Sequence, residues 1–234
     1  TGWYVRKPVG DILLVDDNAL VDNSTQFYTA MLDSLNLNGR YDIWDIKLGK
    51  TSTIPAKLLP KFISPQFTET LKLFKVIFWY TDNDPTLEPA QISVRNYVVN
   101  GGKILFSMIF PQVFDTRGLS DFLPVDSLSP VPISFIPVNT AILPVEEGTV
   151  LNYPLLVRDN NTSPVARIRT YYPNELTAKK LYNLDLSGQA NIGFKSSDSQ
   201  IIYMGIPIHR VNGNPFNVKS FFAKVLFDEF GVTP

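Results

Sequence analysis

The sequence contains no cysteine and only one histidine, His209. The absence of cysteine excludes disulfide bonds, thiolate nucleophiles and Cys-based metal sites. Any imidazole chemistry must therefore depend on His209. The chain also lacks a basic excess, because 21 Lys and Arg stand against 22 Asp and Glu, and this balance argues against a nucleic-acid partner. No apolar run approaches the ~18 residues that a membrane-spanning helix needs.

The chain has 234 residues, of which 44% are apolar and 18% charged, and this composition supports a substantial core. It contains 18 Pro and has N-x-Thr triplets at Asn23 and Asn160. Together with the missing cysteine, these features favour an extracytoplasmic location, secreted or at the cell surface, although a cytosolic protein can also lack cysteine. The start at Thr1, without Met, is what we expect of a mature form or of a piece of a larger exported protein.

The stretch 11–17, DILLVDD, is a short apolar run that ends abruptly in two carboxylates. Such a run predicts a strand buried on both faces. Similar runs then alternate with amphipathic segments, and this alternation predicts a mostly parallel, doubly wound sheet. We therefore expect one α/β domain over 1–234, three-layered and flavodoxin-like. The expected strands are 11–17, 41–46, 76–80 and 103–108, and the expected helices are 23–38, 65–74 and 89–100.

Local signals support the first of these helices. Asn23 can cap its first turn, with Gln26 as the reciprocal partner, and Gly39 can end it in the left-handed conformation. The regular pattern breaks in the stretch 111–188, which is rich in Pro and has short β-like pieces at 131–138 and 165–172. We interpret it as a β-rich insertion or an antiparallel extension of the sheet. The parallel pattern is expected to resume with strands at 190–195 and 200–206 and a final helix over 215–230.

Four acids follow two strands that should be neighbours in the sheet. Asp16 and Asp17 end the first strand, and Asp82 and Asp84 follow the strand 76–80. The carboxyl ends of parallel strands line the crevice where ligands bind, so these residues are candidate ligand-binding groups. Asp16 and Asp82 are also candidate ligands of a hard cation. The alternative is that the acids cap the following helices. No cofactor is indicated.

The run ILLVDDN also looks like the opening of a response-regulator receiver domain, whose paired acids hold magnesium. A receiver needs a phosphorylatable Asp at the end of its third strand. The corresponding region, near Leu59 and Pro60, is a Pro-rich stretch without such an Asp. No late strand ends in the expected Lys-Pro either, so the receiver interpretation is poorly supported.

A second resemblance covers residues 11–110 and 201–232. The series DILLVDDN, YDIWDI, VIFWYTDND, YVVNGGKILFSM and QIIYMGIPIH, followed by an amphipathic helix, resembles the class I glutamine amidotransferase-like superfamily. It is most similar to the bacterial branch that lacks the catalytic Cys and is attached to secreted or surface proteins. The resemblance implies the flavodoxin-like fold given above. The middle section has no counterpart in it.

Active members of that superfamily carry a Cys on a glycine-flanked turn after the strand that corresponds to 103–107. Here that place is occupied by Ser107 and Met108, with no glycine beside them. The superfamily's Gly-x-x-x-His arrangement is present as Gly205 to His209, but Val211 stands where the orienting Glu is expected. The resemblance therefore implies no glutamine amidotransferase activity. Met108 and His209 remain candidate ligand-binding residues, and Ser107 with His209 is a candidate catalytic pair.

Two functional hypotheses follow. The first is a non-catalytic amidotransferase-like module that serves binding or structure within a larger exported protein, with a small molecule, a glycan or a protein as partner. The second is a hydrolase that acts on glycans, esters or peptides through Asp16, Asp82, Ser107 or His209. The alternative for Ser107 and His209 is that neither has a chemical role. In that case Ser107 packs at a strand end and His209 lies on a surface turn beside Arg210.

Overall fold

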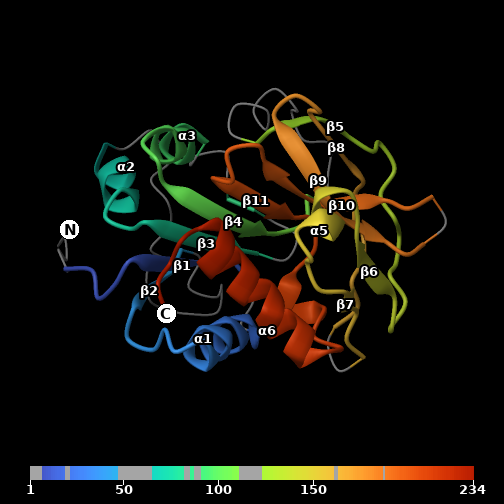
Figure 1. The fold of residues 1–234 in the computed structure, drawn as a ribbon, viewed down its shortest axis with the longest axis horizontal. Helices are drawn as coiled ribbons and strands as arrows, with labels where there is room; N and C mark the ends of the chain where they lie inside the picture. The colour runs from blue at the N-terminus through green and yellow to red at the C-terminus, as the bar shows by residue number, and fades with distance from the viewer. Residues whose placement is uncertain are drawn as a thin grey trace, which may run out of the picture.

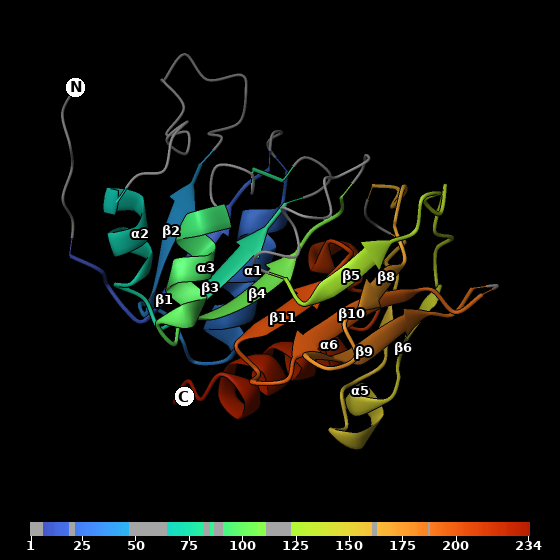
Figure 2. The same cartoon turned by 90° about the horizontal axis from the view of Figure 1, so that it is seen from above.

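The computed structural model describes residues 7–18, 22–46, 65–81, 85–86, 91–110, 123–160, 163–186 and 188–234. Its centre is a nine-stranded sheet with the order β2-β1-β3-β4-β11-β10-β9-β6-β7, accompanied by a two-stranded sheet of β5 and β8 (Figures 1 and 2). The strands are β1 Ile12–Asp16, β2 Tyr41–Asp45, β3 Val76–Tyr80, β4 Lys103–Ser107, β5 Val125–Leu128, β6 Ala141–Pro144, β7 Leu156–Val157, β8 Tyr171–Pro173, β9 Ala178–Leu184, β10 Asn191–Ser196 and β11 Ile201–Met204. The helices are α1 Ser24–Ser34, α2 Pro65–Leu71, α3 Gln91–Val99, α5 Glu147–Val150 and α6 Pro215–Ala223, with a 3-10 turn η2 Ile208–Arg210 and a π-helical segment η3 Lys224–Glu229.

The first half of the sheet confirms the alternating α/β pattern. Strands β2, β1, β3, β4 and β11 pair in parallel, and β1 is hydrogen-bonded on both sides. The first expected strand ends one residue early, because Asp16 is its last residue. The chain is thus a mixed α/β protein with a large central sheet whose main strands are parallel. All the major strands expected from the apolar runs in this half are present.

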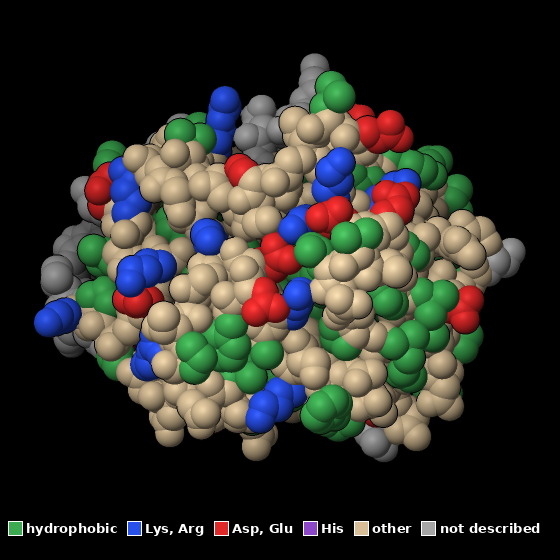
Figure 3. Space-filling model, viewed as in Figure 1, with side chains coloured by type: hydrophobic (Ala, Val, Ile, Leu, Met, Phe, Trp, Pro, Cys, Tyr) green, Lys and Arg blue, Asp and Glu red, His purple; other side chains and the backbone are tan. Residues whose placement is uncertain are grey.

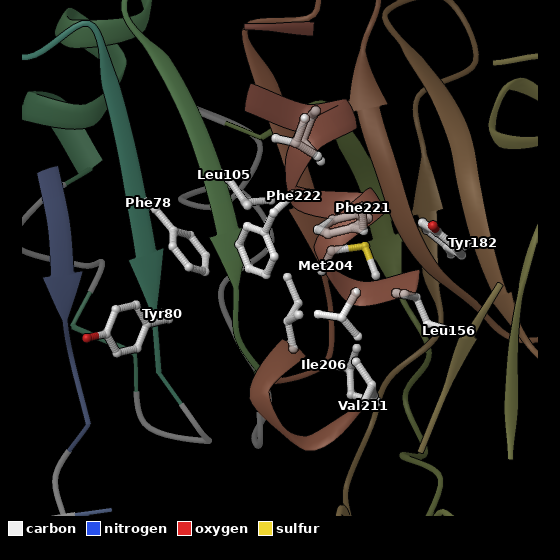
Figure 4. Packing of buried hydrophobic residues seen from close by; sticks show 14 of the residues in the cluster. Phe78, Tyr80, Leu105, Leu156, Tyr182, Met204, Ile206, Val211, Phe221 and Phe222 are labelled. Carbon is white, nitrogen blue, oxygen red and sulfur yellow. The ribbon is translucent and has the colours of Figure 1, made fainter. Parts of the chain in front are cut away.

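Helices cover both faces of the parallel half. Figure 1 shows α1 and α6 on one side of the sheet and α2 and α3 on the other. Because successive strand residues point to opposite faces, β1 contributes to two cores: Ile12 and Leu14 pack on the side of α6, while Leu13 and Val15 pack on the side of α2 and α3. Figure 4 shows the first core, with Phe222 of α6 against Phe78 and Leu105. Because both faces of such a strand are buried, neither face carries polar side chains, and the sequence of the strand is a continuous apolar run.

The second half of the sheet differs from the sequence expectation. The strand at 190–195 was expected to be parallel, but β10 is antiparallel to both β9 and β11. The physical reason is the connection: a few residues, 197–200, join β10 to β11, and a turn that short can only link antiparallel neighbours. From the stretch 111–188, β6, β7 and β9 extend the sheet, while the piece at 131–138 forms only isolated bridges through Ile133 and Ile136.

The helix ends also differ from their local signals. Helix α1 stops at Ser34, and Asn36, with a φ of 62°, occupies the left-handed position after the helix end. Gly39 is left-handed as expected, with a φ of 71°, but it lies in the turn beyond the helix. The side chain of Asn23 makes no cap hydrogen bond; instead Asp22 Oδ1 accepts from the backbone N of Ser24 at 2.9 Å. The final helix begins as expected at Pro215. No helix among the described residues is long and apolar enough to span a membrane.

Candidate functional site

The candidate residues meet where the parallel strands end. Asp16 is the last residue of β1 and Ser107 the last of β4, and η2 brings His209 back over the same edge after β11. Helix α1 follows β1 and directs Tyr28 between them. Parallel strands assemble this edge because all of their carboxyl ends lie on one side of the sheet. We refer to Tyr28, Ser107 and His209 as the strand-end cluster.

The hydroxyl of Tyr28 is the centre of this cluster. It lies 3.2 Å from Ser107 Oγ and 3.3 Å from His209 Nδ1. It also accepts a hydrogen bond from the backbone N of His209 at 3.2 Å. The phenol itself is buried, with its ring against Tyr80 and Phe78. A serine and a histidine that sequence analysis pairs directly are therefore connected through a third side chain.

Ser107 is fully buried. Its hydroxyl donates to the carbonyl of Ile206 at 3.2 Å and accepts from the backbone N of Ile208 at 2.9 Å. Within the described part of the chain, Ser107 Oγ makes no direct hydrogen bond to the imidazole of His209. These contacts fasten the end of β4 to the turn that leads into η2. Ser107 thereby provides hydrogen-bond partners for the backbone of this buried turn, and the turn provides partners for the hydroxyl. Buried polar groups generally need such partners.

His209 is also buried, with 4% of its surface exposed, and the expectation of a surface turn is wrong. Burial lowers the pKa of His209 to about 4, assisted by Arg210, while Asp22 opposes the shift. The carboxylate Oδ2 of Asp22 lies 3.6 Å from His209 Nε2. The guanidinium Nε of Arg210 donates to the same Nε2 at 3.4 Å. The imidazole is therefore neutral at pH 7. The face of the molecule drawn in Figure 3 shows no histidine side chain.

The direction of the hydrogen bonds follows from these contacts. Arg210 Nε can only donate, so its contact favours the neutral tautomer with the imidazole proton on Nδ1, whereas the Asp22 carboxylate near the same Nε2 favours a proton on Nε2. With the proton on Nδ1, this proton and the backbone N–H of His209 both point to the Tyr28 oxygen, which leaves the phenol proton for Ser107. Ser107 then donates to Ile206. The serine proton thus points away from the imidazole, which is the reverse of what nucleophile activation needs.

The adjacent acids Asp16 and Asp17 point to opposite faces of the sheet. Asp16 accepts from the hydroxyl of Thr25 and from the backbone N of Asn18 at 3.0 Å. Burial raises the pKa of Asp16, and Asp45 and Asp22 add to the effect, whereas the two hydrogen bonds oppose it. The period of two along a strand separates neighbouring side chains in this way. These two acids therefore cannot serve one ligand together.

Asp17 is fully buried on the other face, where it has a structural role. Its Oδ2 accepts from Trp79 Nε1 at 3.1 Å and from the backbone N of Thr86 at 2.7 Å, and its Oδ1 accepts from the Thr86 hydroxyl. It therefore ties the end of β1 to the loop after β3. Met108 is buried as well, and its carbonyl accepts from the Tyr203 hydroxyl at 3.2 Å.

Asp82 and Asp84 lie outside the described residues, so the predicted pairing of Asp16 with Asp82 stays a prediction. Within the described ranges there is no group of three or more His, Asp or Glu side chains that could hold a metal ion. Tyr28 and Asp22 belong to this site although no sequence pattern marks them. Tyr28 is indistinguishable from a core residue in the apolar stripe of α1, and nothing local indicates a partner far along the chain.

Comparison with known proteins gives no further guide to this arrangement. No protein-family model matches the chain, and no curated protein matches it.

Proposed function

We propose that this chain is a non-catalytic, amidotransferase-like module that serves binding or structure within a larger exported protein. Its architecture is flavodoxin-like and three-layered. In support, the parallel strands follow the order β2-β1-β3-β4-β11, which corresponds to the flavodoxin order 2-1-3-4-5, and helices lie on both faces. In such folds ligands bind at the carboxyl ends of the strands, the edge that carries the strand-end cluster.

One observation carries the non-catalytic proposal: the Tyr28 hydroxyl lies between Ser107 Oγ and His209 Nδ1. A nucleophilic serine needs a base within hydrogen-bond reach and an accessible oxygen. Ser107 has neither, since its surface is fully buried and its proton is directed to Ile206. A histidine whose pKa is lowered to about 4 is also a weak base at neutral pH.

The alternative is a hydrolase that acts on esters, glycans or peptides. The observation that favours it is the continuous polar chain from Ser107 through Tyr28 to His209 and Asp22. In this mechanism Tyr28 relays a proton between the serine and the imidazole through the contacts described above. This mechanism requires Ser107 to become accessible to a substrate.

Activity assays distinguish the non-catalytic module from the hydrolase. Purified protein is tested with p-nitrophenyl acetate, p-nitrophenyl glycosides, a casein substrate and glutamine, beside the variants Ser107→Ala and His209→Asn. We expect wild type and both variants to give the same background rate in every assay. Turnover that both substitutions abolish, in variants that circular dichroism shows to be folded, would establish the hydrolase instead. Ser197→Ala, an exposed serine outside the cluster, is the matched control.

Export is tested separately. The full-length parent protein, carrying a C-terminal tag, is followed by cell fractionation and by protease digestion of intact cells. We expect the tag to appear outside the cytoplasm and to be removed by added protease. Retention of the intact, protected protein in the cytoplasm would contradict this part of the proposal.

A further inference from the structure

A groove of about 440 Å³ lies at the opposite end of the sheet from the strand-end cluster. One wall is the C-terminal part of α3 with Val98 and Val99, and the other is the turn between β10 and β11. Ile201, the first residue of β11, lines the groove, whereas Ser107 is the last residue of β4 and His209 follows β11 at the far edge of the sheet. The volume is within the range of small-molecule sites, roughly 300–1,000 Å³.

The groove offers an apolar surface that no other part of the described chain covers. Val99 is 76% exposed and Leu176 is 90% exposed, although both are large apolar side chains. Leu123 and Pro124 also line the groove. Isolated apolar residues on a surface need no explanation, but apolar side chains gathered around a concave site favour a ligand with an apolar body.

Two opposite charges line the groove, and only one of them has partners. Asp198 Oδ1 accepts from the Ser196 hydroxyl and from the backbone N of Gln200 at 3.0 Å, so the carboxylate is held within its own turn. Arg95 forms no hydrogen bond or ion pair with any residue that the structure describes. The two do not pair with each other. Arg95 is exposed at the rim, and the charge without a partner at the groove is therefore positive, which favours an anionic ligand over a cationic one.

We propose that this groove binds a small carboxylic acid with an apolar chain. The carboxylate is held by the guanidinium of Arg95, which presents its donors in the fork that a carboxylate fits. The hydrocarbon chain lies along Val99 and Leu176 and covers the apolar wall. This inference goes beyond the proposed function and does not depend on whether the strand-end cluster is catalytic, because the two sites share no residue.

The test uses octanoate, followed by isothermal titration calorimetry and by the NMR shifts of the Val99 and Leu176 methyl groups. We expect saturable binding that shifts both residues. Octylammonium, which has the same chain and the opposite charge, should bind at least tenfold more weakly. Arg95→Gln should weaken octanoate binding roughly tenfold, about the effect of one charge-assisted hydrogen bond. Lys219→Gln, an exposed cation on α6 outside the groove, should leave it unchanged.

A second variant tests the apolar wall. Leu176→Ser changes a side chain that is almost fully exposed, so the fold should tolerate it, and we expect weaker octanoate binding. Equal affinity for octanoate and octylammonium, or equal effects of Arg95→Gln and Lys219→Gln, would overturn the proposal. So would the absence of saturable binding. Tighter binding of N-acetyl-Ala-Leu-Leu than of octanoate would replace the small acid by the C-terminus of a protein.

Discussion

The hydroxyl of Tyr28 and Nδ1 of His209 lie 3.3 Å apart, although 181 positions separate the two residues in the sequence. The contact joins α1 to η2 across the carboxyl edge of the sheet, and the same hydroxyl reaches Ser107 at 3.2 Å. A buried polar group that loses its partner costs about 1–3 kcal/mol, so this arrangement has measurable consequences for folding.

Replacing Tyr28 with Phe removes the hydroxyl that Ser107 Oγ, His209 Nδ1 and the backbone N–H of His209 share. We expect the free energy of unfolding to fall by about 1–3 kcal/mol, measured by urea denaturation at pH 7. Tyr172→Phe is the control, since Tyr172 is half exposed and should change stability by less than about 0.5 kcal/mol. Equal effects of the two substitutions would contradict the hydrogen-bond network.

Stability should depend on pH through His209. Its folded pKa is about 4, below the usual value of 6.5, so the unfolded chain binds more protons between these values. Stability from this group is therefore complete above about pH 6.5 and falls as the pH drops toward 4, by up to ~3 kcal/mol. The variant His209→Asn should lose less stability over the same range. The comparison requires urea denaturation of both proteins at several pH values.

The protonation state of His209 can also be measured directly, because the chain has only one histidine. Its imidazole signals can be followed by NMR without assignment of other histidines. We expect the ¹⁵N shifts to indicate a neutral ring protonated at Nδ1, and to stay constant from pH 7 to pH 5. Titration near pH 6.5 would mean that the imidazole is solvated and that the burial described above is incorrect.

Asp16 should behave in the opposite way to His209. Its pKa is raised by burial, so the folded state binds more protons than the unfolded state just above the usual value of 3.8. Its contribution to stability therefore decreases as the pH rises through this range. We therefore expect the change in the free energy of unfolding caused by Asp16→Asn to be more favourable at pH 7 than at pH 3.5. Urea denaturation of both proteins at the two pH values measures this difference. A variant that is relatively more destabilised at pH 7 would show that the carboxylate is favoured by a partner.

The C-terminal segment depends on a buried ion pair. Lys195 Nζ lies 2.9 Å from Glu229 Oε2, and both side chains are only 8% exposed. Removing one partner leaves a buried charge, so Glu229→Gln should cost about 3–5 kcal/mol. The i,i+4 pair of Lys224, which is partly buried, and Asp228, which is exposed, is the control, and Asp228→Asn should cost less than about 1 kcal/mol. Similar losses in urea denaturation for the two variants would contradict the importance of burial.

The apolar runs of the sequence by themselves determined the parallel half of the fold. A strand such as 76–80 is buried on both faces and must be apolar throughout, and such runs separated by amphipathic segments admit few arrangements other than an α/β sheet. The sequence also placed Asp16, Ser107 and His209 at strand ends, which the parallel topology brings to one edge.

Only the tertiary structure decided what those residues contact. The direction of β10 depends on a short turn to its neighbour, and the partners of Asp16 and Asp17, Thr25 on one face and Trp79 on the other, depend on which elements cover each face of the sheet. Tyr28 carries no local sign that its hydroxyl meets His209, because hydrogen bonds between distant segments leave no periodic pattern in a sequence. The pattern of apolar residues therefore specifies the sheet, while the polar contacts at its edge are set by packing.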